Sequence, residues 1–426
     1  MIICFITIST FLFSQSRIPR PEFQSDYPIP SPTTPNPDPD YGDYINIIVL
    51  IICLSLTSYF AIVKRSRVGI FWITVFSLIY FGFWRKGCIC PVASIQNISL
   101  SLFTSGYTIP LTIIGLLSIP LIFALFFGRV FCASVCPIGA IQELVIIKHI
   151  KIPYWLNQAL GIIPYVYLGL SVLAAATGAE FLISRFHPFL GFFRLSAQFE
   201  MIILGVIFLV AGIFIARPYC RFLCPYGALL RLMSKFSKWH LSITPDECID
   251  CRLCEDSCPY GAIEKPTPEY DLENRSTGKR RLLILFVLVP ILVSGGVFIG
   301  SRMDRILSYI HPTVRIAQRI ILEDSGSVND TTLESEAFRK TGQSVDDLLQ
   351  EVRIIVEQFS FGGMLFGAFV GLMICLKLFG LSIWKRRKIY EVNRSDCLSC
   401  GRCFEYCPRD HTHIKKKKGI ITENES

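Results

Sequence analysis

Seven long apolar segments limit what this chain can fold into. Each is close to the twenty residues that an α-helix needs to cross a bilayer: residues 44–63, 68–84, 107–127, 160–177, 201–216, 282–300 and 361–381. Hydrophobic residues make up 52% of the 426 residues, and the mean hydropathy is +0.49. The sequence therefore predicts an α-helical polytopic membrane protein with about seven transmembrane helices.

The basic residues predict how these helices are oriented. The chain carries a net charge of +9, and its basic clusters stand at the ends of apolar segments, around residues 64–67, 148–151, 217–238, 279–281 and 385–388. The positive-inside rule then predicts a multi-pass protein of the cell (inner) membrane with its N-terminus outside and these clusters in the cytoplasm. No basic helix stands apart from the membrane segments, so nucleic-acid binding is not expected.

The N-terminal region has a different composition. Residues 1–16 are apolar and end in small polar residues, which is typical of a signal sequence or anchor. Residues 17–43 are rich in Pro, Ser, Asp and Asn. This stretch is predicted to be a disordered extracytoplasmic linker.

Two matched cysteine runs predict metal centres. Both read C-x2-C-x2-C-x3-C-P, and they comprise Cys248, Cys251, Cys254 and Cys258, and Cys397, Cys400, Cys403 and Cys407. In such pairs of runs, three close cysteines ligate one [4Fe–4S] cluster and the fourth ligates the other. The predicted ligand sets are Cys248, Cys251, Cys254 and Cys407 for one cluster, and Cys397, Cys400, Cys403 and Cys258 for the second. Structural zinc is the alternative, but it favours two separated C-x2-C pairs.

The two runs are far apart in the chain. We expect a five-span membrane domain over residues 44–240, a first ferredoxin half-motif over 241–280, a transmembrane hairpin over 281–384 with an exported loop at 301–360, and a second half-motif with a basic tail over 385–426. A cytoplasmic bacterial-type dicluster ferredoxin-like α+β module forms only if the two halves meet. Otherwise each run must ligate its own cluster.

A second cysteine system forms an internal repeat. Cys132 and Cys136 precede Pro137, and Cys220 and Cys224 precede Pro225, each pair after an arginine and an apolar segment. Cysteines four apart share one helix face, so the two pairs are candidate ligands of a further metal centre or a redox dithiol. Packing as small buried residues is the alternative.

An imperfect third copy contains Cys88, Cys90 and Pro91. The predicted topology places it on the outer side of the membrane, away from the two C-x3-C-P pairs. Its thiols are candidates for a redox couple or part of a cofactor site. The alternative is that Cys90-Pro91 merely begins a helix.

In combination, the C-x-C-P motif, the two C-x3-C-P pairs and the two ferredoxin runs resemble the NosR/NapH family of membrane-bound polyferredoxins. The resemblance implies [4Fe–4S] clusters at the eight ferredoxin cysteines. It also implies electron transfer between a quinol or cytoplasmic donor and a respiratory or maturation partner. NosR-type members carry an exported flavin-binding domain, for which the N-terminal stretch here is too short. A flavin is therefore expected only on a partner subunit.

Two hypotheses follow for the function. The first is a membrane-bound iron–sulfur protein that relays electrons between a cytoplasmic or quinol donor and a respiratory or extracytoplasmic partner, such as an exported flavoprotein or reductase. No substrate pocket is evident in the sequence, so this protein is expected to be an electron-transfer subunit rather than a stand-alone enzyme. The second is an assembly factor that handles copper or iron for an exported metalloenzyme.

Overall fold

Most of the chain is helical. The computed structural model describes residues 41–87, 90–104, 107–147, 150–196, 198–243, 248–267, 275–328, 330–382 and 387–409. The predicted signal segment 1–16, residues 17–40 of the predicted linker, Cys88 and the basic tail lie outside the described residues.

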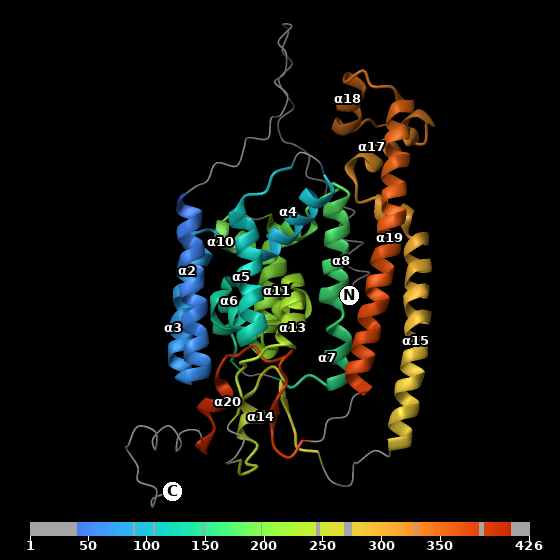
Figure 1. Cartoon of the computed structure of the whole chain (residues 1–426). Coiled ribbons are helices and arrows are strands. Elements are labelled where there is room, and N and C mark those ends of the chain that lie inside the picture. The colour runs from blue at the N-terminus through green and yellow to red at the C-terminus, as the bar shows by residue number, and fades with distance from the viewer. Residues whose placement is uncertain are drawn as a thin grey trace, which may run out of the picture. The chain divides into compact units, whose positions relative to one another are not determined.

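Each of the seven apolar segments lies in one or more helices (Figure 1). These are α2 (Tyr41–Ser58) with a π-helical continuation (Tyr59–Val63), α3 (Arg67–Ser77) with a second one (Leu78–Trp84), α5 (Leu111–Phe127), α7 (Tyr154–Leu160) with α8 (Ile163–Ala176), α11 (Phe199–Phe214), α15 (Arg275–Arg302) and α19 (Val345–Ser382).

Candidate membrane spans can be identified among the described residues. Five helical stretches there are long and apolar enough to cross a membrane: Gly42–Val63, Arg67–Trp84, Tyr154–Ala176, Ser276–Arg302 and Val345–Ser382. A sixth arises if the bent pair Pro188–Arg194 and Phe199–Phe214 counts as one span, and Leu111–Phe127 is a shorter apolar helix. The structure thus supports five or six candidate spans, and the count of about seven stays a prediction. At 1.5 Å per residue, the 17 residues of α5 reach only about 25 Å, less than a typical hydrocarbon core.

Proline begins a set of short helices between the long ones. The set comprises α4 (Pro91–Phe103), α6 (Pro137–Leu144), α10 (Pro188–Arg194), α12 (Pro218–Phe222) and α13 (Pro225–Ser234). Proline suits the first helical position because its fixed φ is helical and its missing N–H would have no partner there. A cysteine is the N-cap residue of α4, α6 and α13. Further short helices are a π-helical segment (Phe131–Val135), α9 (Leu182–Arg185) and α16 (Asp304–Ser308).

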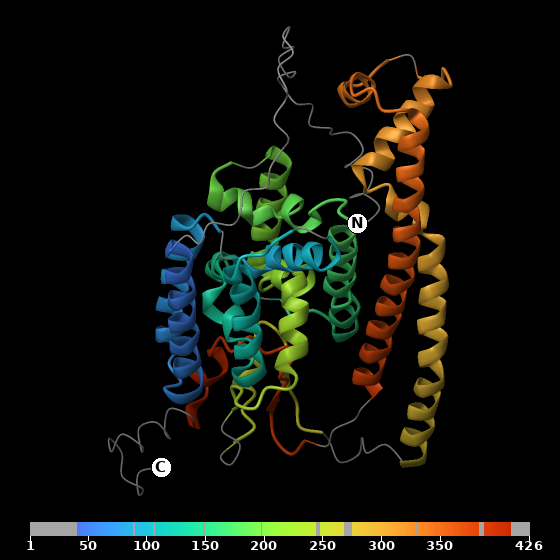
Figure 2. The same ribbon diagram turned by 45° about the horizontal axis from the view of Figure 1, so that its top comes forward.

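Helices α15 and α19 pack through glycine. They run side by side in Figures 1 and 2. A Cβ built on Gly300 would lie 2.0 Å from the carbonyl oxygen of Gly363, and one on Gly367 would lie 2.0 Å from that of Gly296. Only glycine allows the two backbones to approach this closely, which is a common basis of helix pairing in membranes.

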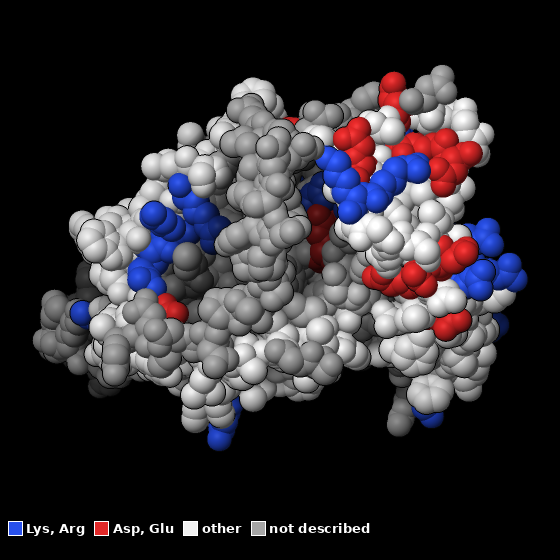
Figure 3. All heavy atoms as spheres, turned by 90° about the horizontal axis from the view of Figure 1, so that it is seen from above, with Lys and Arg blue, Asp and Glu red and all other residues white. Residues whose placement is uncertain are grey.

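Residues 312–354 belong to a separate compact unit, described here over 312–328 and 330–354. It contains α17 (Pro312–Asp324), α18 (Leu333–Lys340) and the start of α19. Leu348 packs against Ala317 and Ile320 in its small core. Acidic and basic side chains alternate on its surface (Figure 3), and Arg339 pairs with Asp324 at 2.8 Å. The unit lies within the loop predicted at 301–360.

The two ferredoxin half-motifs meet in the folded chain. The first contributes α14 (Leu253–Ser257) and β1 (Ile263–Glu264), and the second contributes β2 (Glu391–Val392) and α20 (Arg402–Glu405). The strands pair antiparallel, with Ile263 opposite Val392, and the two segments lie side by side in Figures 1 and 2. The largest buried cluster of hydrophobic residues extends from Leu50 in α2 to Leu398 in the second half-motif.

Candidate metal centres

The two ferredoxin loops share an unusual backbone. Asp250 and Ser399 occupy the same position in their runs, and both have a positive φ, of 54° and 53°. Arg252 and Gly401 also correspond, with φ values of 63° and 79°. Left-handed residues in such loops turn successive N–H groups inward, and the resulting concavity binds anions, including iron–sulfur clusters. Both loops therefore have the backbone that an anionic cluster needs.

Strand pairing brings the cysteines of the two half-motifs close together. The Asn393 backbone N–H donates to the Ala262 carbonyl at 2.7 Å, and the Asn393 side chain donates to Glu264 at 2.8 Å. Arg387 adds an ion pair to Glu264. These contacts fix the register in which α14 faces α20, so each run ends beside the other.

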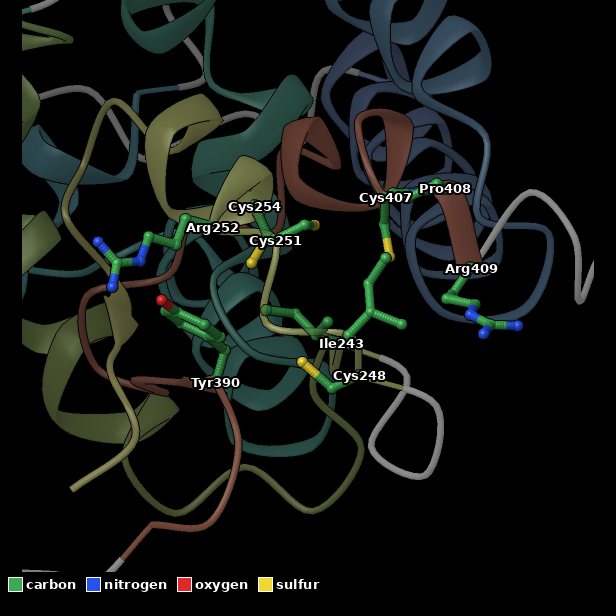
Figure 4. Close-up of a pocket in the computed structure, with 10 residues that line it drawn as sticks. Ile243, Cys248, Cys251, Arg252, Cys254, Tyr390, Cys407, Pro408 and Arg409 are labelled. Atoms are coloured by element: carbon green, nitrogen blue, oxygen red, sulfur yellow. The ribbon is translucent and has the colours of Figure 1, made fainter. Parts of the chain in front are cut away.

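Four cysteines line a pocket of about 390 Å³. We call it the exposed site, because two of its members, Cys248 and Cys251, are solvent-exposed. The sulfur of Cys407, from the second half-motif, points into the same space as those of the three cysteines from the first (Figure 4). The full set is Cys248, Cys251, Cys254 and Cys407.

A neighbouring pocket of about 330 Å³ has the complementary cysteines. We call it the buried site. Its lining includes Cys258 from the first half-motif and Cys397, Cys400 and Cys403 from the second. The structure thus brings together the same two sets of four that the spacing predicted.

The donor chemistry of both sites fits a metal cluster. Burial raises the pKa of Cys254 to about 11 and that of Cys397 to about 12, so these thiols are protonated at neutral pH in the protein alone. A bound metal supplies the positive charge that stabilises thiolates. The Ser399 backbone N–H already points at the Cys397 sulfur, at 3.3 Å.

A buried carboxylate joins the half-motifs to the membrane helices. Glu143 on α6 accepts from Arg217 Nε at 3.1 Å, from Arg402 at 2.8 Å, from Arg67 at 3.3 Å and from the Tyr260 hydroxyl at 2.9 Å. Burial alone would raise the pKa of Glu143, but the three arginines outweigh it and lower this pKa to about 2. The network stays charged at physiological pH.

This Glu143 network was not found from the sequence. Its members are spread over residues 67–402, and no local motif joins them. The sequence contains one recurring feature that is related to the network. An arginine stands three residues before the first cysteine of each C-x3-C-P pair, at Arg129 and Arg217. The pattern gave no indication of what these arginines bind.

The C-x3-C-P cysteines form a group with Cys90, which we call the thiol layer: Cys90, Cys132, Cys136, Cys220 and Cys224. Three of them, Cys132, Cys220 and Cys224, are buried, and the other two are half-buried. The Cys136 thiol lies within electrostatic range of Cys220, Cys90 and Cys132, and Cys224 lies within range of Cys136, Cys132 and Cys90. Burial raises the pKa of Cys136 and of Cys224 well above its ordinary value. The expected separation of Cys90 from the two C-x3-C-P pairs is thus not seen, while the side of the membrane on which Cys90 lies stays a prediction.

Polar groups surround the thiol layer. Gln142 donates to the Cys220 sulfur at 3.3 Å, and the Gly227 N–H donates to that of Cys224 at 3.3 Å. His187 accepts from the Leu190 N–H through Nδ1 at 3.2 Å, and its Nε2 lies 3.9 Å from the Cys90 sulfur. Burial lowers the pKa of His187 to about 4, so its ring is neutral and Nε2 carries the proton.

The described residues form no site for a single metal ion. Within the described ranges, no group of three or more His, Cys, Asp or Glu side chains is placed to hold one metal ion. This applies to the ferredoxin pockets as well as to the thiol layer. Thiolates around a cluster lie further apart than those around a single ion, because the cluster itself stands between them.

Comparison with known proteins agrees with this arrangement. One family profile, described as a 4Fe-4S binding domain, matches residues 108–162 and 197–244, which contain both C-x3-C-P pairs. A second profile with the same description matches residues 241–264, which contain the first ferredoxin run.

Three curated relatives are similar over part of their length. YccM of Escherichia coli K12, a protein named for electron transport, is 29% identical over 40% of this chain and 52% of YccM. NirI of Paracoccus denitrificans is 32% identical over 33% of this chain and 22% of NirI. The regulatory protein NosR of Pseudomonas aeruginosa is 30% identical over 51% of this chain and 33% of NosR.

The matched region thus spans about half or less of each of these relatives. No solved structure matches. The chain thus carries segments that match 4Fe–4S binding domains, and it is distantly similar to NosR, NirI and YccM over part of its length.

Proposed function

We propose that this chain is a membrane-bound electron-transfer protein whose exposed and buried sites each hold one [4Fe–4S] cluster. The observation that carries the proposal is the crossed set of cysteines: each pocket takes three from one run and one from the other. This is the ligation pattern of two-cluster ferredoxins. When bound, each cluster supplies a one-electron carrier.

The residues around the two sites suit different ends of a relay. The exposed site, with Cys248 and Cys251 open to solvent, is the one that a water-soluble partner can approach. The buried site adjoins the thiol layer, because Arg129 donates to the Ser395 carbonyl at 3.5 Å and lies 3.9 Å from the Cys132 sulfur. Cys258, Cys397 and Cys400 also pack against the hydrophobic core that contains Cys132 and Cys220.

The partners follow from this placement and from the charge pattern. We place the ferredoxin module on the cytoplasmic side of the inner membrane, where a cytoplasmic donor reaches the exposed site. The second partner exchanges electrons at the end of the relay away from the exposed site. It is a quinol that donates from within the membrane, or an exported flavoprotein or reductase. The protein then acts as a subunit of a larger electron-transfer system.

The competing role is delivery of copper or iron to an exported enzyme. Such a role needs thiols that hold a single ion and release it. The crossed sets of four cysteines favour the relay, since they match the ligand pattern of two-cluster ferredoxins.

The test is anaerobic purification in detergent, reconstitution into vesicles, and low-temperature EPR after addition of a quinol or a low-potential donor. Reduction of two interacting [4Fe–4S] signals, lost one at a time in Cys251→Ser and Cys400→Ser, supports the relay. Stoichiometric copper with no reducible iron signal would support metal handling instead.

A further inference from the structure

Two basic side chains converge where α7, α13 and α19 meet. Lys377 of the apolar helix α19 donates to the Gln158 side chain of α7 at 3.1 Å, and Figure 1 shows α7 beside this end of α19. Arg231 comes from α13. A Cβ built on Gly161, just after α7, would lie 3.1 Å from Lys377 Nζ and 3.2 Å from a terminal nitrogen of Arg231. Two like charges from different helices therefore approach one point.

This group carries more positive than negative charge. A third cation, Arg221, donates to the Asn157 side chain at 3.0 Å and to the Tyr260 carbonyl at 2.9 Å, both of which are neutral acceptors. Arg231 lies 3.6 Å from Asp396, and its buried Nε has no hydrogen-bond partner. Within the part of the chain that the structure describes, this is the one ion pair that the three cations form. An excess of positive charge away from water is costly unless an anion approaches it.

The surroundings of these cations are typical of a membrane interface. Lys377 is half-buried and stands near the end of a 38-residue helix, next to the exposed Leu376. The first turn of α7 presents two exposed aromatic side chains, Tyr154 and Trp155. Tyr and Trp gather at the level of the lipid headgroups, and a lysine near a helix end extends its ammonium group to the same level. Basic pockets between membrane helices bind anionic headgroups there.

We propose that Lys377 and Arg231 bind the phosphate group of an anionic phospholipid between α7, α13 and α19, with Arg221 adding to the positive potential. The phosphate oxygens accept charge-assisted hydrogen bonds from the ammonium and guanidinium groups, and the bound lipid neutralises the excess charge. Arg231 also pairs with Asp396, which directly precedes Cys397 of the buried site. The lipid therefore binds next to the second ferredoxin half-motif, where α19 and α13 meet.

The test uses the whole chain, purified in detergent without phosphate buffer, washed free of lipid, and titrated with phosphatidylglycerol, phosphatidylcholine or inorganic phosphate. Its unfolding temperature should rise with phosphatidylglycerol and stay unchanged with the other two. Lys377→Gln should weaken the apparent affinity for phosphatidylglycerol about fivefold, the effect of one basic residue at an anionic lipid surface, and Lys377→Arg should retain it. Lys238→Gln removes an exposed lysine just after α13 and is the matched control, with unchanged affinity.

A second readout separates lipid binding from a structural role of Lys377. In phosphatidylcholine, Lys377→Gln should unfold at or above the wild-type temperature, because the repulsion between Lys377 and Arg231 is removed, whereas in phosphatidylglycerol the wild type should be the more stable. An equal loss of stability in both lipids would overturn the inference, since the lost hydrogen bond to Gln158 would explain it. Full affinity in Lys377→Gln would also overturn it, and equal stabilisation by inorganic phosphate would overturn the assignment to a lipid. None of these readouts measures iron, so they are independent of the proposed function.

Discussion

The exposed and buried sites are made from the same loop but lie in opposite surroundings. The loops of both sites have two left-handed residues at matching positions. Each site is lined by three cysteines of one run and one cysteine of the other. The exposed site has two solvent-exposed cysteines and surface ion pairs, such as Lys265 with Glu255 at 3.2 Å. The buried site lies against the Glu143 network, and Arg67 donates to the Cys400 carbonyl at 3.1 Å.

This difference indicates how the module is attached. The exposed site is lined by residues of the two half-motifs alone. The buried site also depends on α6 of the membrane domain, through Glu143 and its three arginines. The cysteines of each pocket are therefore distinct from the Glu143 network, which holds the ferredoxin module against the membrane helices.

The largest expected effect comes from Glu143→Gln. Removing one partner of a buried ion network costs about 3–5 kcal/mol, because Arg217, Arg402 and Arg67 would face an uncharged amide. We expect a lower unfolding temperature and loss of the buried-site EPR signal before that of the exposed site. Glu255→Gln, which breaks surface pairs with Lys151 and Lys265, is the control and should cost less than about 1 kcal/mol. Equal effects of the two variants would contradict the comparison.

A smaller effect is expected from exchanging the left-handed residues. Gly401→Ala forces a Cβ to within 2.5 Å of the Phe404 ring at a φ of 79°, which adds about 1–2 kcal/mol of backbone strain to the steric clash. Arg252→Gly, at the corresponding position, removes such strain. Iron retention on mild heating should fall in the first variant and stay at or above the wild-type level in the second. Iron loss from Arg252→Gly alone would show that the loops are not equivalent.

Solvent access should separate the two sites in the unmodified protein. A hydrophilic iron chelator, added to the oxidised protein, should remove iron from the exposed site first, because Cys248 and Cys251 are open to water while Cys403 is buried. The decay of the two EPR signals after rapid reduction gives the two rates. If both signals decayed together, cluster loss would be limited by a shared opening of the module.

The smallest expected effect is that of pH. The pKa of Glu143 falls from the usual 4.5 to about 2 in the folded protein, so its contribution to stability is full above about pH 4.5 and is lost as the pH falls toward 2. The difference in unfolding temperature between wild type and Glu143→Gln should therefore be the same at pH 8 and pH 6. A difference that shrank between these two values would mean that the carboxylate titrates near neutrality.

Residue spacing and hydrophobic periodicity were sufficient to predict part of this structure from the sequence. The apolar segments lie in helices because backbone groups in a hydrocarbon phase must bond within their own segment. The cysteine spacing indicated which four residues would line each pocket, because loop geometry is local. Strand pairing between Ile263 and Val392 then supplied the long-range contact, which no local pattern specified.

The remainder depends on contacts distant in sequence. Glu143 is one acidic residue among 33, and only the fold shows that arginines from three segments converge on it. The predicted topology separated Cys90 from Cys136 because it assumed that the apolar segments cross the membrane in simple alternation. Helix α5 is shorter than its apolar segment of residues 107–127 because it begins only after Pro110, whose ψ of 141° is extended, and hydropathy does not report this.

Crossed ligation of the two sites depends on which cluster Cys407 binds. EPR and Mössbauer spectra of Cys407→Ser, recorded beside those of Cys251→Ser and Cys400→Ser, show which cluster Cys407 ligates. With crossed ligation, Cys407→Ser alters the same signal as Cys251→Ser and leaves the signal affected by Cys400→Ser intact. If Cys407→Ser instead altered the signal that Cys400→Ser alters, each run would hold its own cluster and crossed ligation would be excluded.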